Sequence, residues 1–190
     1  MRIHPIAIAA LAIVVACGGT AAPAPAATQT AAPTTATPTA KPLTATVELK
    51  DKDGTTVATA ALTEQTGGVR IALTATKIPA GQHGWHIHAV GKCDAPDFTT
   101  AGGHFNPDSK QHGAQNPQGA HAGDLGNLAA AADGTARADL VAKVTLAPGA
   151  TSLLKADGTA IVIHAVFDDE KTDPTGNSGA RIACGVVKSS

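Results

Sequence analysis

Hydrophobic and polar residues alternate with a period of two along most of the chain after residue 43. Val47 and Leu49 alternate with threonine and glutamate, and Val69, Ile71 and Leu73 repeat the pattern. Successive side chains of a β-strand point to opposite faces, so this period indicates strands with one buried face. Further strands are expected at residues 55–62, 84–90, 128–132, 135–146 (either continuous or broken), 159–166 and 182–187.

Two kinds of connection separate these runs. Asp133-Gly134 and Asp157-Gly158 are dipeptides typical of β-hairpin turns. Residues 91–127 and 167–181 are too long, and too rich in glycine, asparagine, proline and aspartate, to be tight turns, so functional loops are expected there. About eight strands without a convincing amphipathic helix predict an all-β sandwich or barrel.

The N-terminal segment has the layout of an export signal. Residues 1–16 hold one arginine near the start and an apolar run too short to span a bilayer. The ending "VVAC" resembles the lipobox of bacterial lipoproteins, in which the cysteine is acylated, so lipidation is expected at Cys17. An ordinary signal cleaved a few residues later is the alternative.

The expected product is an exported lipoprotein, anchored in a membrane through Cys17 and facing the periplasm or the cell exterior. Residues 17–41, rich in alanine, proline and threonine, are predicted to be a linker, which leaves residues 42–190 as the folded domain. Three cysteines are an odd number for an exported protein. If Cys17 carries the lipid, Cys93 and Cys184 remain to pair, the alternative being two free buried thiols.

Net charge argues against one class of partner. The formal net charge is -1, and no long run of lysine and arginine occurs, so nucleic-acid binding is not expected.

Histidines supply the candidate chemistry, because imidazole nitrogen suits copper and zinc. His86 and His88 share one face of an expected strand while Trp85 and Ile87 share the other, and His164 follows the apolar run "AIVI". A second group, His104, His112, His121 and Asp124, lies along the glycine-rich loop of residues 91–127. Three imidazoles and one carboxylate can close a tetrahedral zinc shell, which is typical of a structural site.

Zinc hydrolase chemistry is not favoured. Such a site keeps an open coordination position and usually a nearby glutamate base, and residues 86–164 contain no glutamate. His83 is expected to bind backbone beside the site rather than a metal.

Five blocks of sequence resemble copper/zinc superoxide dismutases: "WHIHAVGKC", "GGHFNP", "HAGDLGN", "IVIHAVFDD" and "GNSGARIACGVV", over roughly residues 43–187. The resemblance implies an immunoglobulin-like, eight-stranded Greek-key β-barrel with the metal site outside it under two long loops. It also implies dismutation of superoxide to dioxygen and hydrogen peroxide, with one copper and one zinc ion per subunit.

Site residues follow from the resemblance position by position. It makes His86, His88, His104 and His164 the copper ligands, and His104, His112, His121 and Asp124 the zinc ligands, with His104 shared. Asp168 matches the aspartate that connects a copper histidine to a zinc histidine. Arg181 matches the arginine that guides and docks superoxide, and Cys93 with Cys184 matches the family disulfide.

Three points stay open on the sequence alone. The segment from Asp168 to Arg181 is shorter than in familiar eukaryotic members, which leaves electrostatic steering, to which Lys171 could contribute, undetermined. A homodimer is compatible with the sequence. The rival function is a non-enzymatic copper- or zinc-buffering lipoprotein with a dismutase-like fold.

Overall fold

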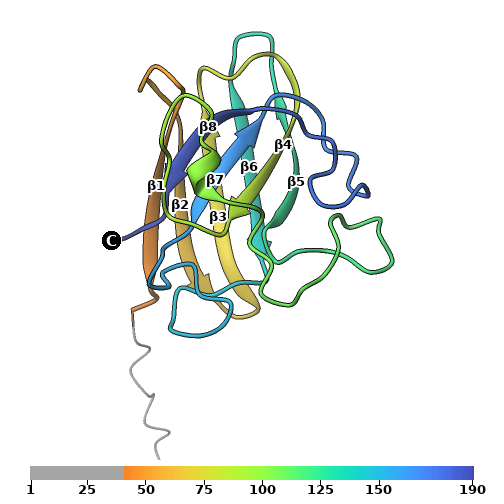
Figure 1. Cartoon of the computed structure of the whole chain (residues 1–190). Helices are drawn as coiled ribbons and strands as arrows, with labels where there is room; N and C mark the ends of the chain where they lie inside the picture. The colour runs from red at the N-terminus through yellow and green to blue at the C-terminus, as the bar shows by residue number, and fades with distance from the viewer. Residues whose placement is uncertain (1–40) are drawn as a thin grey trace, which may run out of the picture. The chain divides into compact units, whose positions relative to one another are not determined.

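The computed structural model describes residues 41–190 (Figure 1). The predicted signal, Cys17 and the linker up to residue 40 lie outside the described residues. Within the described part, no helix is both long and apolar enough to cross a membrane.

Eight antiparallel strands form a closed barrel. They are β1 (Thr44–Lys50), β2 (Thr56–Gln65), β3 (Gly68–Ala75), β4 (Gly81–His88), β5 (Asp124–Ala130), β6 (Ala136–Ala142), β7 (Ala160–His164) and β8 (Arg181–Val186). Their order around the barrel is β2-β3-β6-β5-β4-β7-β8-β1, and pairing of β1 with β2 closes it. Because β3 pairs with β6 and β4 with β7, the connections cross between hairpins, as the Greek-key expectation requires.

Two small elements were not expected from the sequence. The two-residue strand β9 (Lys188–Ser189) pairs with β1, and a single turn of 3-10 helix, η1 (Thr99–Ala101), interrupts the loop after β4.

The alternating apolar side chains fill the barrel interior. In β1, Ala45, Val47 and Leu49 are buried while the residues between them face solvent or lie partly exposed. Trp85, the only tryptophan of the chain, is buried in the same core. The barrel core is therefore the one that the period of two predicts.

Strand β7 and the part of β4 from His83 onward are buried on both faces. Trp85 and Ile87 of β4 pack into the barrel core, so the neighbouring His86 and His88 point to the outer face and are nevertheless buried. The cover on that outer face comes from the two long connections.

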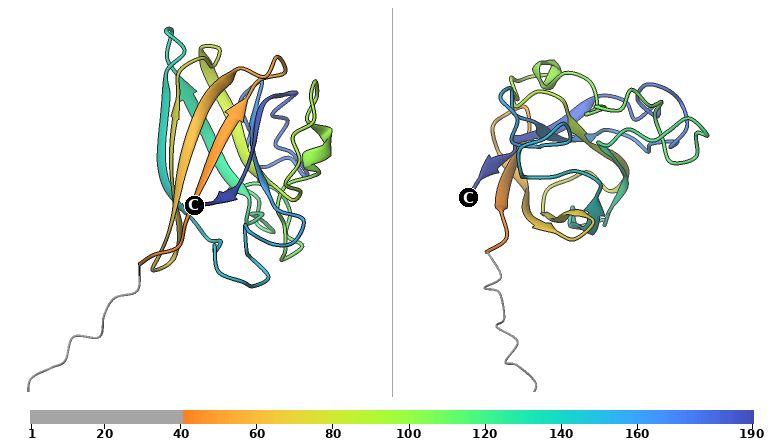
Figure 2. Two further views of the ribbon diagram at one scale, coloured as in Figure 1. Left: turned by 90° about the vertical axis from the view of Figure 1, so that its left-hand side faces the viewer. Right: turned by 90° about the horizontal axis from the view of Figure 1, so that it is seen from below.

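These connections are the loop of residues 89–123 between β4 and β5 and the loop of residues 165–180 between β7 and β8. They lie side by side at one side of the barrel in both figures (Figures 1 and 2). The backbone amide of Gln115 donates to the carbonyl of Glu170 at 2.9 Å. A Cβ on Gly113, whose φ is +95°, would lie 2.0 Å from that carbonyl group, so this close approach requires glycine.

The structure corrects two details of the sequence-based expectation and decides a third. Strand β5 begins at Asp124 rather than at residue 128, because it pairs with β4 as far as His86. Strand β6 ends at Ala142, so the expected run of residues 135–146 is broken there. Asp157-Gly158 is not a hairpin turn: the irregular segment before it leads into β7, and the turn instead packs against Gly91, whose amide donates to the Asp157 carbonyl.

Candidate metal centre

Four histidines from three elements converge outside the barrel. His86 and His88 come from β4, His164 ends β7, and His104 comes from the first long loop, where it forms a β-bridge with His88. One ring nitrogen from each lies within 4.8 Å of those of the others. The Nε2 atoms of His88 and His164 are 3.3 Å apart, and the rings of His86 and His104 are stacked with centroids 3.9 Å apart.

Two nitrogens in this group fit a bound cation. His86 Nδ1 and His104 Nε2 are buried and have no hydrogen-bond partner in the described structure. Leaving a buried polar atom unpaired costs about 1–3 kcal/mol. A copper ion among the four imidazoles would satisfy both nitrogens, and an all-imidazole donor set suits copper.

The second donor group surrounds one carboxylate oxygen. Asp124 Oδ1 lies 3.0 Å from Nδ1 of His104, 3.0 Å from Nδ1 of His112 and 3.2 Å from Nδ1 of His121. The other oxygen, Oδ2, accepts hydrogen bonds from the backbone amides of Gly113 and His121 at 2.9 Å. Three imidazoles and a carboxylate converging on one point fit a closed tetrahedral zinc site.

His104 belongs to both groups through different atoms. Its Nδ1 faces Asp124 and lies 3.4 Å from Nδ1 of His121, whereas its Nε2 is the unpartnered nitrogen on the side of the four histidines. One ring is thereby placed to bridge two cations, as the resemblance implies.

Asp168 connects the two groups through the outer nitrogens of His86 and His112. Its Oδ2 lies 2.5 Å from Nε2 of His86, and its Oδ1 lies 2.9 Å from Nε2 of His112. The side chain is buried at 1% exposure. Asn127 holds Asp168 in turn, through reciprocal hydrogen bonds between its side-chain amide and the Asp168 backbone at 2.8 and 2.9 Å. The role of Asn127 carries no sequence signal, because an asparagine after a glycine-rich loop is ordinary.

The four histidines of the first group, here called the copper-side histidines, are buried, and burial keeps their imidazoles ready to bind a cation. Burial lowers the pKa of His88 to about 2, that of His164 to about 3 and that of His104 to about 4. These imidazoles are therefore neutral near pH 7, and the neutral form is the one that binds metal.

The second group, His104, His112, His121 and Asp124, is here called the zinc side. It holds a negative charge on Asp124. Burial would raise the pKa of Asp124, but hydrogen bonds with His104, His112 and His121 hold that pKa far below its usual range. Burial alone would lower the pKa of His112, but hydrogen bonds to Asp124 and Asp168 raise it to about 9. In the metal-free protein a proton on His112 partly balances the two carboxylates, and zinc would displace that proton.

Arg181 lies beside the copper-side histidines and is half-buried. Its Nη1 donates to the carbonyl of Phe98 and its Nη2 to the carbonyl of Gly102, both at 2.6 Å. The Gly102 carbonyl also lies 2.9 Å from Nδ1 of His88. One backbone oxygen thus positions both the guanidinium and a candidate copper ligand. Such anchors are backbone atoms, so sequence reasoning missed them.

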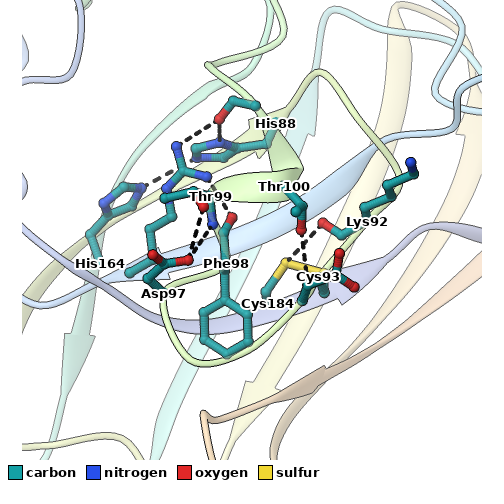
Figure 3. The surroundings of a disulfide bond; sticks show 12 residues. His88, Lys92, Cys93, Asp97, Phe98, Thr99, Thr100, His164 and Cys184 are labelled. Carbon is teal, nitrogen blue, oxygen red and sulfur yellow. Dashed lines mark hydrogen bonds between the residues drawn. A yellow bond between two sulfur atoms is a disulfide. The ribbon is translucent and has the colours of Figure 1, made fainter.

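The predicted disulfide is confirmed. Cys93 and Cys184 are bonded, with their Cα atoms 5.6 Å apart and 91 positions apart in sequence. Figure 3 shows the bond close to Phe98, with His88 and His164 in the same view. Phe98, Ala101 and Cys184 form a small apolar cluster with Ala160 and Val162 of β7, which fastens the loop that anchors Arg181 to the barrel.

His83 has the backbone-binding place that the sequence predicts for it. Its Nδ1 lies 2.8 Å from the carbonyl of His164 and its Nε2 lies 2.8 Å from the carbonyl of Pro79.

Comparison with known proteins agrees with this geometry. The sequence model of copper/zinc superoxide dismutase matches residues 54–187. Superoxide dismutase [Cu-Zn] 1 of Aquifex aeolicus is 46% identical over 144 residues, covering 74% of this chain and 85% of that protein. Superoxide dismutase [Cu-Zn] of Caulobacter vibrioides is 42% identical over 148 residues, covering 76% and 85%. The crystal structure of a superoxide dismutase-like protein from Bacillus subtilis has a TM-score of 0.72 at 41% identity, covering 74% of this chain and 96% of that one. The chain therefore belongs to the copper/zinc superoxide dismutase family.

Proposed function

We propose that this protein converts two superoxide anions and two protons into dioxygen and hydrogen peroxide. Copper would be held by His86, His88, His104 and His164, and zinc by His104, His112, His121 and Asp124. The observation that carries the proposal is the sharing of His104 between two complete donor groups, each of which supplies the atoms that its metal prefers.

Copper, when bound, supplies the one-electron redox couple that oxidises one superoxide and reduces the next. The residues of the chain supply the rest. Arg181 offsets the charge of the incoming anion, since each Nη retains a second N–H beyond the one given to a carbonyl. His104 Nε2, when free of metal, can hold a proton within reach of the reduced substrate. Asp168 fixes the rings of His86 and His112.

Metal content and turnover measured on one sample test the proposal. The purified protein should hold one copper and one zinc ion per chain, and superoxide decay should accelerate in proportion to copper occupancy. A fully metallated protein no faster than free copper would contradict the dismutase function and favour the metal-buffering alternative.

Neutralising Arg181 should slow capture of superoxide without emptying the metal site. Arg181→Gln keeps a donor for one carbonyl but loses the charge, so the second-order rate should fall about tenfold and its dependence on ionic strength should flatten. Arg181→Lys should be milder, because the charge survives while the planar donor fork is lost. Pulse radiolysis at low and high salt would measure both.

Lys171→Gln is the matched control for Arg181, since it removes one exposed cation from the connection that leads into β8, the strand that begins at Arg181. Its effect should be smaller than that of Arg181→Gln. Wild-type rates and salt dependence in copper-replete Arg181→Gln would refute the anion-docking role.

We also propose that the protein is exported and lipid-anchored at Cys17. The disulfide supports this, because Cys93 and Cys184 account for two of the three cysteines and leave Cys17 for another fate. Mass spectrometry of the membrane fraction should find a mature N-terminus at lipid-modified Cys17, and Cys17→Ser should leave the membrane fraction. An unmodified N-terminus beyond residue 17 would contradict the anchor.

The homodimer that the sequence allows stays a prediction. The mass of the protein in solution would test it.

A further inference from the structure

The three zinc-side imidazoles each turn Nδ1 toward the shared centre, which leaves the outer nitrogen of each ring to be accounted for. The outer nitrogen of His104 faces the copper group. That of His112 lies 2.9 Å from Oδ1 of Asp168. That of His121 lies 3.8 Å from Oδ1 of Asp173. This last separation is too long for a hydrogen bond and is a contact between charge and ring.

Asp173 makes a second contact with the zinc side. Its Oδ1 accepts a hydrogen bond from the backbone amide of His112 at 2.7 Å. The same oxygen therefore holds the backbone of one zinc-side histidine and lies next to the ring of another. Asp173 comes from the loop between β7 and β8, whereas both histidines come from the loop between β4 and β5, so the contact also joins the two loops.

We propose that Asp173 is a second positioning residue of the zinc site: it holds the backbone of His112 by a hydrogen bond and acts on the ring of His121 through its charge. The inference rests on the proposed assignment of zinc to His104, His112, His121 and Asp124. A histidine that binds metal through Nδ1 carries its proton on Nε2, and a negative charge beside that N–H favours this tautomer and ring orientation.

The expected effect is smaller than that of Asp168. The Asp173 side chain is 47% exposed, whereas the Asp168 side chain is 1% exposed. Solvent and salt screen the exposed carboxylate. Loss of an outer partner of a metal ligand typically lowers metal affinity by about 10–100-fold, and Asp173 belongs at the lower end of that range.

Asp169 provides a matched control in the same loop. Its carboxylate binds only neighbours in that loop, accepting from the amides of Lys171 and Thr172 at 3.0 and 2.8 Å and from the side chain of Asn177 at 3.0 Å. Asp169→Asn therefore removes the same charge and loosens the same loop without touching a zinc-side histidine. Asp108→Asn removes an exposed carboxylate from the other loop.

The experiment measures transfer of zinc from the copper- and zinc-loaded protein to an excess of a chromophoric chelator. Asp173→Asn keeps an oxygen that can accept from the His112 amide but loses the charge beside His121. Zinc should dissociate about tenfold faster from Asp173→Asn than from the wild type, while Asp169→Asn and Asp108→Asn stay close to the wild type. With cobalt(II) in place of zinc, the visible ligand-field bands should shift in Asp173→Asn and not in Asp169→Asn.

Three results would overturn the inference. Wild-type zinc dissociation and an unchanged cobalt spectrum in Asp173→Asn would show that Asp173 positions no ligand. Equal acceleration in Asp169→Asn would assign the effect to loop anchoring. Asp124→Ala, which removes a proposed zinc donor, distinguishes failure of the zinc assignment from failure of the Asp173 role alone. If Asp124→Ala retains its zinc, the zinc assignment fails, and the role of Asp173 fails with it.

Discussion

Replacing His88 by alanine should remove nearly all copper-dependent dismutase activity while leaving the barrel folded. The His88 side chain is on the outer face of β4, opposite Trp85 and Ile87, so its loss leaves the core contacts of those residues in place. Its Nε2 lies 3.3 Å from Nε2 of His164, where copper would be held. Loss of even an outer partner of a metal ligand costs about 10–100-fold, so loss of a donor should cost more than about 100-fold in activity. Copper analysis and superoxide decay would be measured on the same sample.

Asp124→Ala is the counterpart of His88→Ala on the zinc side. It removes the one carboxylate among three imidazoles and opens a closed shell, so zinc content and stability should fall first. Copper should remain bound. If His88→Ala kept full copper-dependent activity, the assignment of the copper site would be wrong.

Removing the disulfide should have the largest effect on stability. The bond between Cys93 and Cys184 closes a loop of 91 residues. In the chain-entropy model a loop of that length contributes about 4–5 kcal/mol to the free energy of unfolding. Domains of this size have total stabilities of about 5–15 kcal/mol. The double variant Cys93→Ser, Cys184→Ser should therefore lose about a quarter or more of its stability, measured by denaturant unfolding of metal-free protein.

The same variant should also lose activity, because the disulfide helps to fix the loop that anchors Arg181. Cys93 packs against the cluster of Phe98 and Ala101, and the carbonyls of Phe98 and Gly102 hold Arg181. A freed loop would let the guanidinium move away from the copper-side histidines. Cys17→Ser is the control and should unfold like the wild type. An unchanged unfolding midpoint in the double variant would show that the disulfide contributes little to the fold.

Local sequence pattern predicted the parts of the fold that depend on the faces of single strands. The alternation of Val47 and Leu49 with polar neighbours placed those side chains in the core, and the spacing of His86 and His88 placed both imidazoles opposite Trp85. Side-chain direction in a strand follows from backbone geometry alone, so it can be predicted without knowing the neighbouring strands.

Pairing between distant segments could not be predicted in this way. Strand β5 extends back to Asp124 because β4 offers it partners there, and the Asp157-Gly158 turn forms no hairpin because β7 pairs with β4 and β8 instead. Such choices depend on contacts between residues far apart in sequence, which a local pattern does not record.

Residue type and spacing indicated the candidate ligands, and the family resemblance assigned them to copper and zinc. Only the tertiary structure decided which groups hold them in place. The oxygens that anchor Arg181 and His88 are backbone carbonyls of Phe98 and Gly102, and any residue type carries such an oxygen. Asn127 meets Asp168 only when the loop after β7 packs against β5, and Asp173 lies beside His121 only when the two long loops fold against each other. The sequence by itself determined which atoms are available to bind metal, and the packing of the loops determined the direction in which each of those atoms points.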